Sequence, residues 1–399
     1  MRKQKCVLAG LLLLFIAEPG MMGATFGTVF PLVGGATDVV LDAPRQRLYL
    51  VGVPDTLQVY SIAQRRILAS IRTDALPLQA AMSRDGRSLY VTCHNASSLN
   101  VIDLETLQIR QRVSLPARPE GVAVGADERV LISTIGTGAG NTQNTLLLYD
   151  PAPDTRAQLS AIPVTLPPPT PPQVPAPSGR VFQINRAQLT ATVDGTLIVG
   201  LNLPNATTRV VFVYEVASGT VLRSRAIAGA SSVISIAPDK SRFMAGLSLI
   251  DMQTLEVLAQ QNLANAPYPI PANTNFNLQT NQGGSVFSPD GARLYSAFNV
   301  APVANPPARA NIAQLMFSDA DNLLIEQGIQ MPENLAGKMV ITPDGGNLFA
   351  LSESGLVQVP LAQLAQQPIA MPTATAVLLT TDQCGVTANQ RAQQITVRN

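Results

Sequence analysis

The chain has 399 residues, of which 46% are hydrophobic and 13% are charged, and its formal net charge is +1. This composition excludes a largely disordered chain, which would have more charge and fewer apolar residues. The balanced charge also excludes the dense Lys and Arg surface that nucleic-acid binding requires, so no nucleic-acid partner is expected.

Residues 1–24 have the pattern of a secretory signal peptide. A basic start at residues 2–5 precedes an apolar stretch over residues 6–17, and small residues end the segment. The apolar stretch is shorter than the roughly 20 residues that a membrane-spanning helix needs. We therefore expect a secreted or periplasmic protein of the cell envelope with no integral membrane span after cleavage; an uncleaved anchor is the alternative.

From residue 37 onward, one pattern of four apolar segments recurs seven times. A tight turn joins the first two segments of each copy, and its Asp and Gly residues supply the backbone angles of a hairpin. The clearest turns are Asp85-Gly86, Asp194-Gly195, Asp239-Lys240, Asp290-Gly291 and Asp344-Gly345, with looser copies at residues 42–44 and 126–128. No segment has helical periodicity. The sequence therefore predicts an all-β fold, a seven-bladed β-propeller of four-stranded antiparallel blades over residues 25–371.

Both ends of the repeat region carry segments that do not belong to a complete repeat. Residues 26–33 look like an isolated strand, which we expect to close the ring as the outer strand of the last blade, with Val29 near Val359. Residues 366–371 are the alternative closing strand. Residues 372–399 predict a short C-terminal β appendage or the start of a further β-domain.

Two motifs in the second repeat resemble a known family. Residues 89–92 read Leu-Tyr-Val-Thr and residues 101–106 read Val-Ile-Asp-Leu-Glu-Thr. This pattern is similar to that of the YVTN and lactonase-like bacterial seven-bladed propellers, and the resemblance covers residues 37–370. Cys93 stands where the family usually has Asn. The resemblance implies the same fold, and it implies that acidic, His and Arg residues at the channel mouth would form a site.

Metal and cofactor chemistry have little support in the sequence. The chain has one histidine, His94, and the signal peptide's removal would leave Cys93 and Cys384, too far apart for a disulfide framework. Cys93 is expected to be a buried free thiol. The first positions of the seven innermost strands align as Asp38, Gln79, Gly121, Gln188, Val233, Gly284 and Lys338. These positions, with Glu120 beside them, hold too few carboxylates for a metal site, so we expect neither a metal nor a cofactor.

Loop length distinguishes the two faces of the predicted disc. The hairpin turns and the turns between third and fourth strands lie on one face and are short. The other face, which we call the long-loop face, carries the connections between second and third strands and the links between blades. Its insertions at residues 136–144, 163–179, 265–284 and 299–310 lie in blades 3 to 6. Tyr268 and Phe276 in the third insertion are candidates for stacking on a sugar or peptide, or for pinning their loop.

Four further residues are candidates for a ligand site at the channel mouth: His94, Arg118, Glu120 and Arg186. Their guanidinium groups would suit a small anion. A structural Arg–Glu pair is the alternative, and we assign no catalytic residue. The favoured function is a secreted, non-catalytic binding or scaffolding module for a protein, peptide or carbohydrate. The alternatives are a lactonase-like hydrolase acting on a lactone or sugar acid, and a structural unit of a multi-domain envelope protein.

Overall fold

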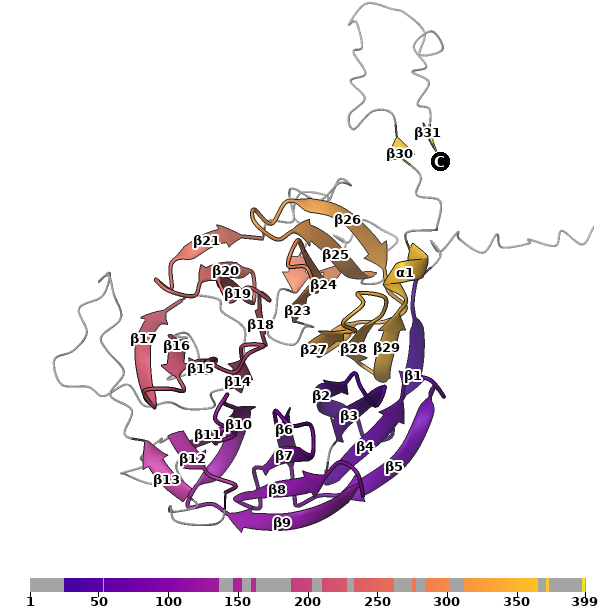
Figure 1. The fold of residues 1–399 in the computed structure, drawn as a ribbon. Coiled ribbons are helices and arrows are strands. Elements are labelled where there is room, and N and C mark those ends of the chain that lie inside the picture. Colours follow the sequence, from indigo (N-terminus) through magenta and orange to yellow (C-terminus); the bar gives the residue numbers. More distant parts are fainter. Residues whose placement is uncertain are drawn as a thin grey trace, which may run out of the picture.

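The structure, a computed structural model, describes the chain in twelve segments. They are residues 25–52, 54–135, 146–152, 159–162, 188–202, 210–227, 233–261, 275–277, 284–301, 312–364, 371–372 and 397–398. Seven antiparallel sheets stand as radial blades around a common axis (Figure 1). This arrangement confirms the predicted seven-bladed propeller.

The first four blades are each formed by four strands that are consecutive in the chain. Blade 1 contains β2 (Ala36–Asp42), β3 (Arg47–Gly52), β4 (Thr56–Ser61) and β5 (Arg66–Arg72). Blade 2 contains β6 (Pro77–Met82), β7 (Ser88–Cys93), β8 (Ser98–Asp103) and β9 (Gln108–Ser114). Blade 3 contains β10 (Arg118–Val124), β11 (Val130–Ile135), β12 (Leu146–Tyr149) and β13 (Leu159–Ile162). Blade 4 contains β14 (Gln188–Ala191), β15 (Leu197–Asn202), β16 (Val210–Glu215) and β17 (Thr220–Ala226).

Blade 5 keeps this simple order, and blades 6 and 7 depart from it. Blade 5 contains β18 (Ile234–Ile236), β19 (Arg242–Ala245), β20 (Ser248–Asp251) and β21 (Val257–Gln260). Blade 6 contains β22 (Asn275–Asn277), β23 (Ser285–Phe287), β24 (Arg293–Ala301), β25 (Ile312–Asp319) and β26 (Ile325–Gln330). Blade 7 contains β27 (Leu335–Ile341), β28 (Leu348–Ser352), β29 (Gly355–Val359) and the N-terminal strand β1 (Thr28–Pro31).

The N-terminal strand closes the ring, as the sequence predicted, but in a different register. β1 pairs antiparallel with β29, and Val29 lies opposite Val357 rather than Val359. The side chains of this segment seal the seam between the last and first blades, because the Phe30 ring packs 5.3 Å from the ring of Tyr60 in blade 1. The alternative closing segment, residues 366–371, lies almost entirely outside the described residues.

The hydrophobic core lies between blades rather than at the axis. One cluster joins Tyr49 and Val51 of blade 1 to Val91 and Ile102 of blade 2, and six similar clusters continue around the ring. Each sheet therefore buries both of its faces, which explains why all six residues of β7 are buried.

A small hydrogen-bonded motif shapes most of the hairpin turns, which together define what we call the turn face. The hydroxyl of Ser83 donates to Asp85, and that carboxylate accepts the N–H of Arg87. Thr192 and Asp194, Ser288 and Asp290, and Thr342 and Asp344 repeat the arrangement. Each motif is followed by a glycine with a positive φ: Gly86, Gly195, Gly291 and Gly345. The turn is thus specified within five residues.

Two elements of the C-terminal half, β22 and α1, were not predicted, whereas a short C-terminal strand pair was. β22 lies within the insertion expected to be a loop, and it pairs with the end of β24, where Phe276 lies opposite Val300. β24 extends beyond the end of β23, so its edge accepts this additional strand. α1 (Leu361–Leu364) follows β29, and β30 (Met371–Pro372) pairs with β31 (Val397–Arg398). Among the described residues, no helix is long and apolar enough to cross a membrane.

Candidate functional site

Polar contacts link the blades around the axis. The contacts are Lys338 with Asp38 (blades 7 and 1), Asp38 with Ala80 (1 and 2), Thr92 with Glu120 (2 and 3), Gln79 with Leu189 (2 and 4), Thr190 with Ile234 (4 and 5), Ser235 with Ser285 (5 and 6), and Gly284 with Gly337 (6 and 7). Most of the members are innermost-strand residues, so we call this set the axial belt. It fixes the blades to one another where a central ligand would bind.

Gln79 makes the longest connection in the axial belt. Its side-chain Nε2 donates to the Leu189 carbonyl at 2.7 Å, and its Oε1 accepts the N–H groups of Val122 at 3.0 Å and Leu189 at 3.3 Å. The side chain therefore spans from blade 2 to blade 4. Gly121, which has no side chain, occupies the equivalent position in blade 3. Because Gln79 is 8% exposed, these groups are paired away from bulk water.

The contact between the last and first blades is ionic. Lys338 Nζ lies 3.3 Å from Asp38 Oδ1, and Asp38 Oδ2 accepts the Ala80 N–H at 2.9 Å. Asp38 is 3% exposed, whereas the Lys338 side chain keeps 31% of its surface. Burial of a carboxylate requires such partners. The two charges therefore compensate each other.

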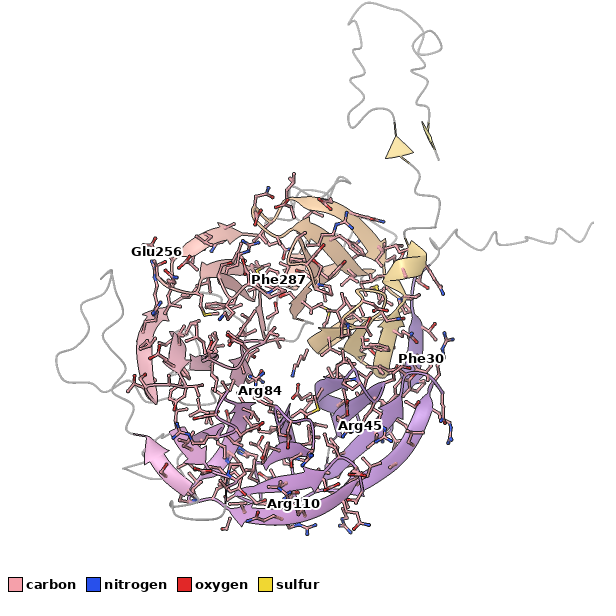
Figure 2. The ribbon with its side chains drawn as sticks, in the orientation of Figure 1. Phe30, Arg45, Arg84, Arg110, Glu256 and Phe287 are labelled. Atoms are coloured by element: carbon pink, nitrogen blue, oxygen red, sulfur yellow. The ribbon has the colours of Figure 1, made fainter. Side chains whose placement is uncertain are left out.

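A cavity of about 260 Å³ lies along the axis, lined mainly by the innermost strands of blades 2, 3 and 4. Lys338 and Gln79 line it toward the long-loop face. Arg84, in the hairpin turn of blade 2, lines the opposite end and lies near the centre of the ring, whereas Arg110 and Glu256 lie on the outer rim (Figure 2). The Arg84 guanidinium donates to the carbonyls of Val193, Val124 and Thr192 at 2.8, 3.0 and 3.2 Å. Burial lowers the pKa of Arg84, against the effect of Asp194 and Glu128.

Two of the predicted site residues meet at the boundary of blades 2 and 3. His94 Nδ1 lies 3.0 Å from the Pro119 carbonyl oxygen and 3.9 Å from Glu120 Oε1. A carbonyl oxygen can only accept, so the first contact places a proton on Nδ1. Both side chains are mostly buried, with 15% and 12% of their surfaces exposed. The pair forms part of the contact between two blades and also faces the side on which the predicted site lies.

Of the other predicted residues, the structure describes Arg118 and Phe276. Arg118 is the exposed first residue of β10, and Phe276 lies in β22. Arg186 and Tyr268 fall outside the described residues, as do most of the long insertions. Among the described residues, no group of three or more His, Cys, Asp or Glu side chains is placed to hold a metal ion. Cys93 is a buried free thiol, as predicted, and burial raises its pKa to about 12.

Several residues of the axial belt already stood out when the first positions of the innermost strands were aligned in the sequence. Asp38, Gln79 and Lys338 are all first positions in that alignment, but we considered them only as metal ligands. Their pairing with one another and with backbone groups was the feature that we missed. Arg84 carried no signal beyond its place next to a hairpin Asp, because its partners belong to blades 3 and 4.

Comparisons with known proteins agree on the fold alone. No protein-family model matches the chain, and no curated protein sequence matches it. Among solved structures, hydrazine synthase of Kuenenia stuttgartiensis matches with a TM-score of 0.58 and 14% identity over 85% of this chain and 99% of that one. The β-propeller domain of Cps50 (Swd1) from Myceliophteria thermophila matches with a TM-score of 0.58 and 12% identity over 84% and 99%. This chain is a β-propeller.

Proposed function

We propose that this protein is a secreted binding or scaffolding module of the cell envelope that recognises a protein, peptide or carbohydrate through its long-loop face. The supporting observation is the contrast between connections that leave the same face. In blades 1 and 2 the strand ends are close in sequence, with residues 53–55 joining β3 to β4 and residues 94–97 joining β7 to β8. In blades 3 and 6 the corresponding connections are residues 136–145 and 302–311, and residues 163–187 link blades 3 and 4 where residues 73–76 suffice between blades 1 and 2. A rigid scaffold with long loops on one side is a common design for recognition.

The turn face supports the same reading, because its polar groups are used within the protein. Its Asp residues accept bonds from neighbouring hydroxyl and N–H groups. Contacts also pass from blade to blade: Lys240 pairs with Asp194 at 2.5 Å, and Glu128 accepts the N–H groups of Arg84 and Asp85. The resemblance to YVTN and lactonase-like propellers also fits a bacterial extracellular role.

The proposal is tested by shortening the long connections. In one variant residues 163–187 are replaced by the four-residue link at residues 73–76, which already joins two blades, and in a second variant residues 136–145 are replaced by residues 94–97. Wild type is first screened on peptide and glycan arrays. We expect each ligand so found to bind at least about tenfold more weakly to one of the variants, a loss of about 1.4 kcal/mol.

The control changes the outer rim instead: Leu222→Ser, at an exposed position of blade 4. It should bind like the wild type. Unchanged affinity in both loop variants, with the propeller still folded by circular dichroism, would refute recognition by the long-loop face.

One observation favours a second candidate, a lactonase-like hydrolase: the 3.9 Å approach of His94 and Glu120. Under this alternative Glu120 and His94 would activate water at the channel mouth. Turnover of lactone or ester substrates that disappears in both His94→Ala and Glu120→Gln, with the fold retained, would establish the hydrolase and reject the non-catalytic proposal.

A further inference from the structure

The axial cavity is lined by backbone groups whose direction can be worked out from the strand pairing. In an antiparallel pair, consecutive residues alternate between facing the partner strand and facing away from it. The N–H of Ala80 donates to Asp38 and the N–H of Ser83 donates to Ser88, so Ala80 and Met82 face away from β7. The same alternation turns Val122 and Val124 of β10 inward, because the N–H of Val122 donates to Gln79 and that of Gly125 donates to Arg129.

Blade 4 follows the same rule. The N–H of Leu189 donates to Gln79 and that of Thr192 donates to Leu197, which leaves Ala191 facing the axis. Gln79 and Arg84 use several of the inward groups at the two ends of the cavity. Between these ends, none of the described residues accepts a hydrogen bond from the inward N–H of Met82, Val124 or Ala191.

We propose that this cavity binds a small neutral molecule rich in hydroxyl groups, no larger than a monosaccharide. The inward carbonyls of Ala80, Met82 and Ala191 accept hydrogen bonds, and the three N–H groups donate them. A hydroxyl both donates and accepts, so a polyol satisfies both kinds of group at once. The volume, about 260 Å³, is that of roughly nine water molecules at about 30 Å³ each.

The charges around the cavity disfavour an ion. An anion would place acceptor oxygens against the strand carbonyls. Lys338 is already paired with Asp38, and the Arg84 guanidinium already donates to three backbone carbonyls. A cation would meet the strand N–H groups and would lie between Lys338 and Arg84. A neutral ligand avoids both penalties, because it brings no charge that needs a buried partner.

The test uses three probes of nearly the same size: glucose, gluconate and glucosamine, titrated into the full chain by calorimetry and by ligand-observed NMR. We expect saturable binding of glucose. Gluconate and glucosamine should bind at least about tenfold more weakly, because leaving one buried polar group unpaired reduces affinity by about that factor. Lys338→Met removes the charge at the cavity mouth and keeps the length of the side chain. Because Lys338 is also the partner of the buried Asp38, this variant is judged by the order of the three affinities: glucose should still bind more tightly than gluconate.

A backbone donor can be removed directly. Ala191→Pro deletes one inward N–H and leaves the bonds to β15 intact, because proline is tolerated where a strand N–H does not face its partner. Glucose binding should fall at least about tenfold in this variant. The matched control is Ile236→Pro in blade 5, whose N–H also faces the axis by the same alternation but which does not line the cavity.

Three results would overturn the proposal. The first is no saturable binding of glucose, which would mean that the cavity holds ordered water only. The second is tighter binding of gluconate that Lys338→Met abolishes, which would mean an anion site. The third is unchanged glucose affinity in a folded Ala191→Pro variant. None of these results bears on recognition by the long-loop face, which is measured with other ligands and other variants.

Discussion

Gln79 shows how one side chain can join separate parts of a propeller. It is 110 residues from Leu189 in the sequence, yet its amide bonds to both backbone groups of that residue. An amide side chain is suited to this position because it donates and accepts within one planar group, as the backbone does. The innermost strands of blades 2, 3 and 4 are consequently held in a fixed relation around the cavity.

Replacing Gln79 with Leu should destabilise the protein substantially. The change leaves the Val122 and Leu189 groups without their partner, and each unpaired buried group costs roughly 1–3 kcal/mol. We expect the free energy of unfolding to fall by about 3 kcal/mol in chemical denaturation. Gln188→Leu, at the equivalent position of blade 4, should change it by less than about 1 kcal/mol. Equal losses in the two variants would show that Gln79 is not a special link.

At the scale of elements, the hairpin turns show how the repeat tolerates sequence variation. Blades 2, 4, 6 and 7 place glycine at the turn residue with positive φ, but blades 1, 3 and 5 place Gln46, Glu128 and Lys240 there, with φ of 49°, 65° and 62°. A side chain at such a φ costs roughly 1–2 kcal/mol. Glu128 and Lys240 offset the cost, because their side chains bond to neighbouring blades.

Gln46→Gly should therefore stabilise the protein by up to about 1 kcal/mol, since it relieves the backbone without removing a side-chain bond to another blade. The reverse change, Gly86→Ala, should destabilise it by a similar amount, because a Cβ there meets no close atom and only the backbone angle is penalised. Thermal unfolding measures both. A lower melting temperature for Gln46→Gly would contradict the strain argument.

The close approach of strand β1 to β29 requires a particular residue, the glycine at position 355. A Cβ on Gly355 would lie 2.2 Å from the Phe30 carbonyl oxygen and 2.7 Å from the Leu32 nitrogen. Glycine is thus required where β1 approaches β29. Any larger residue there must displace the closing strand.

Gly355→Val should release β1 and lower the free energy of unfolding by at least about 2 kcal/mol, the contribution of one buried large apolar side chain. Deleting residues 25–31 should cost the same, and the two changes together should cost no more than either alone. A Val29→Cys, Val357→Cys double variant should crosslink on oxidation, whereas Val29→Cys, Val359→Cys should not. Additive losses, or the opposite crosslinking result, would place β1 elsewhere.

For the whole molecule, the carboxylates around the turn face link stability to pH. Hydrogen bonds from Ser83, Ser288 and Thr342 hold the pKa values of Asp85, Asp290 and Asp344 below the ordinary range, and the bond from Lys240 does the same for Asp194. The unfolded chain binds these protons more readily than the folded protein does. The stabilisation is therefore complete above the unfolded pKa of about 4 and is lost as pH falls further.

We expect the free energy of unfolding to decrease steadily from about pH 5 to pH 2, the range in which paired Asp residues titrate. In Asp85→Asn, which retains an acceptor oxygen but does not titrate, the decrease should be smaller. Urea unfolding at a series of pH values provides the measurement. A slope in Asp85→Asn identical to that of the wild type would show that this carboxylate does not contribute.

The sequence by itself determined the number of blades and the place of the hairpin turns, and it left two candidates for the strand that closes the ring. These features depend on bonds within a few residues, such as Ser83 with Asp85, or on a pattern that recurs once per blade. Only the tertiary structure decided that Gln79 reaches blade 4, that Lys338 pairs with Asp38, that Arg84 lines the end of the cavity, and that Val29 lies opposite Val357. Those contacts join residues from different blades, and their partners are set by the curvature of the closed ring, which no local pattern specifies.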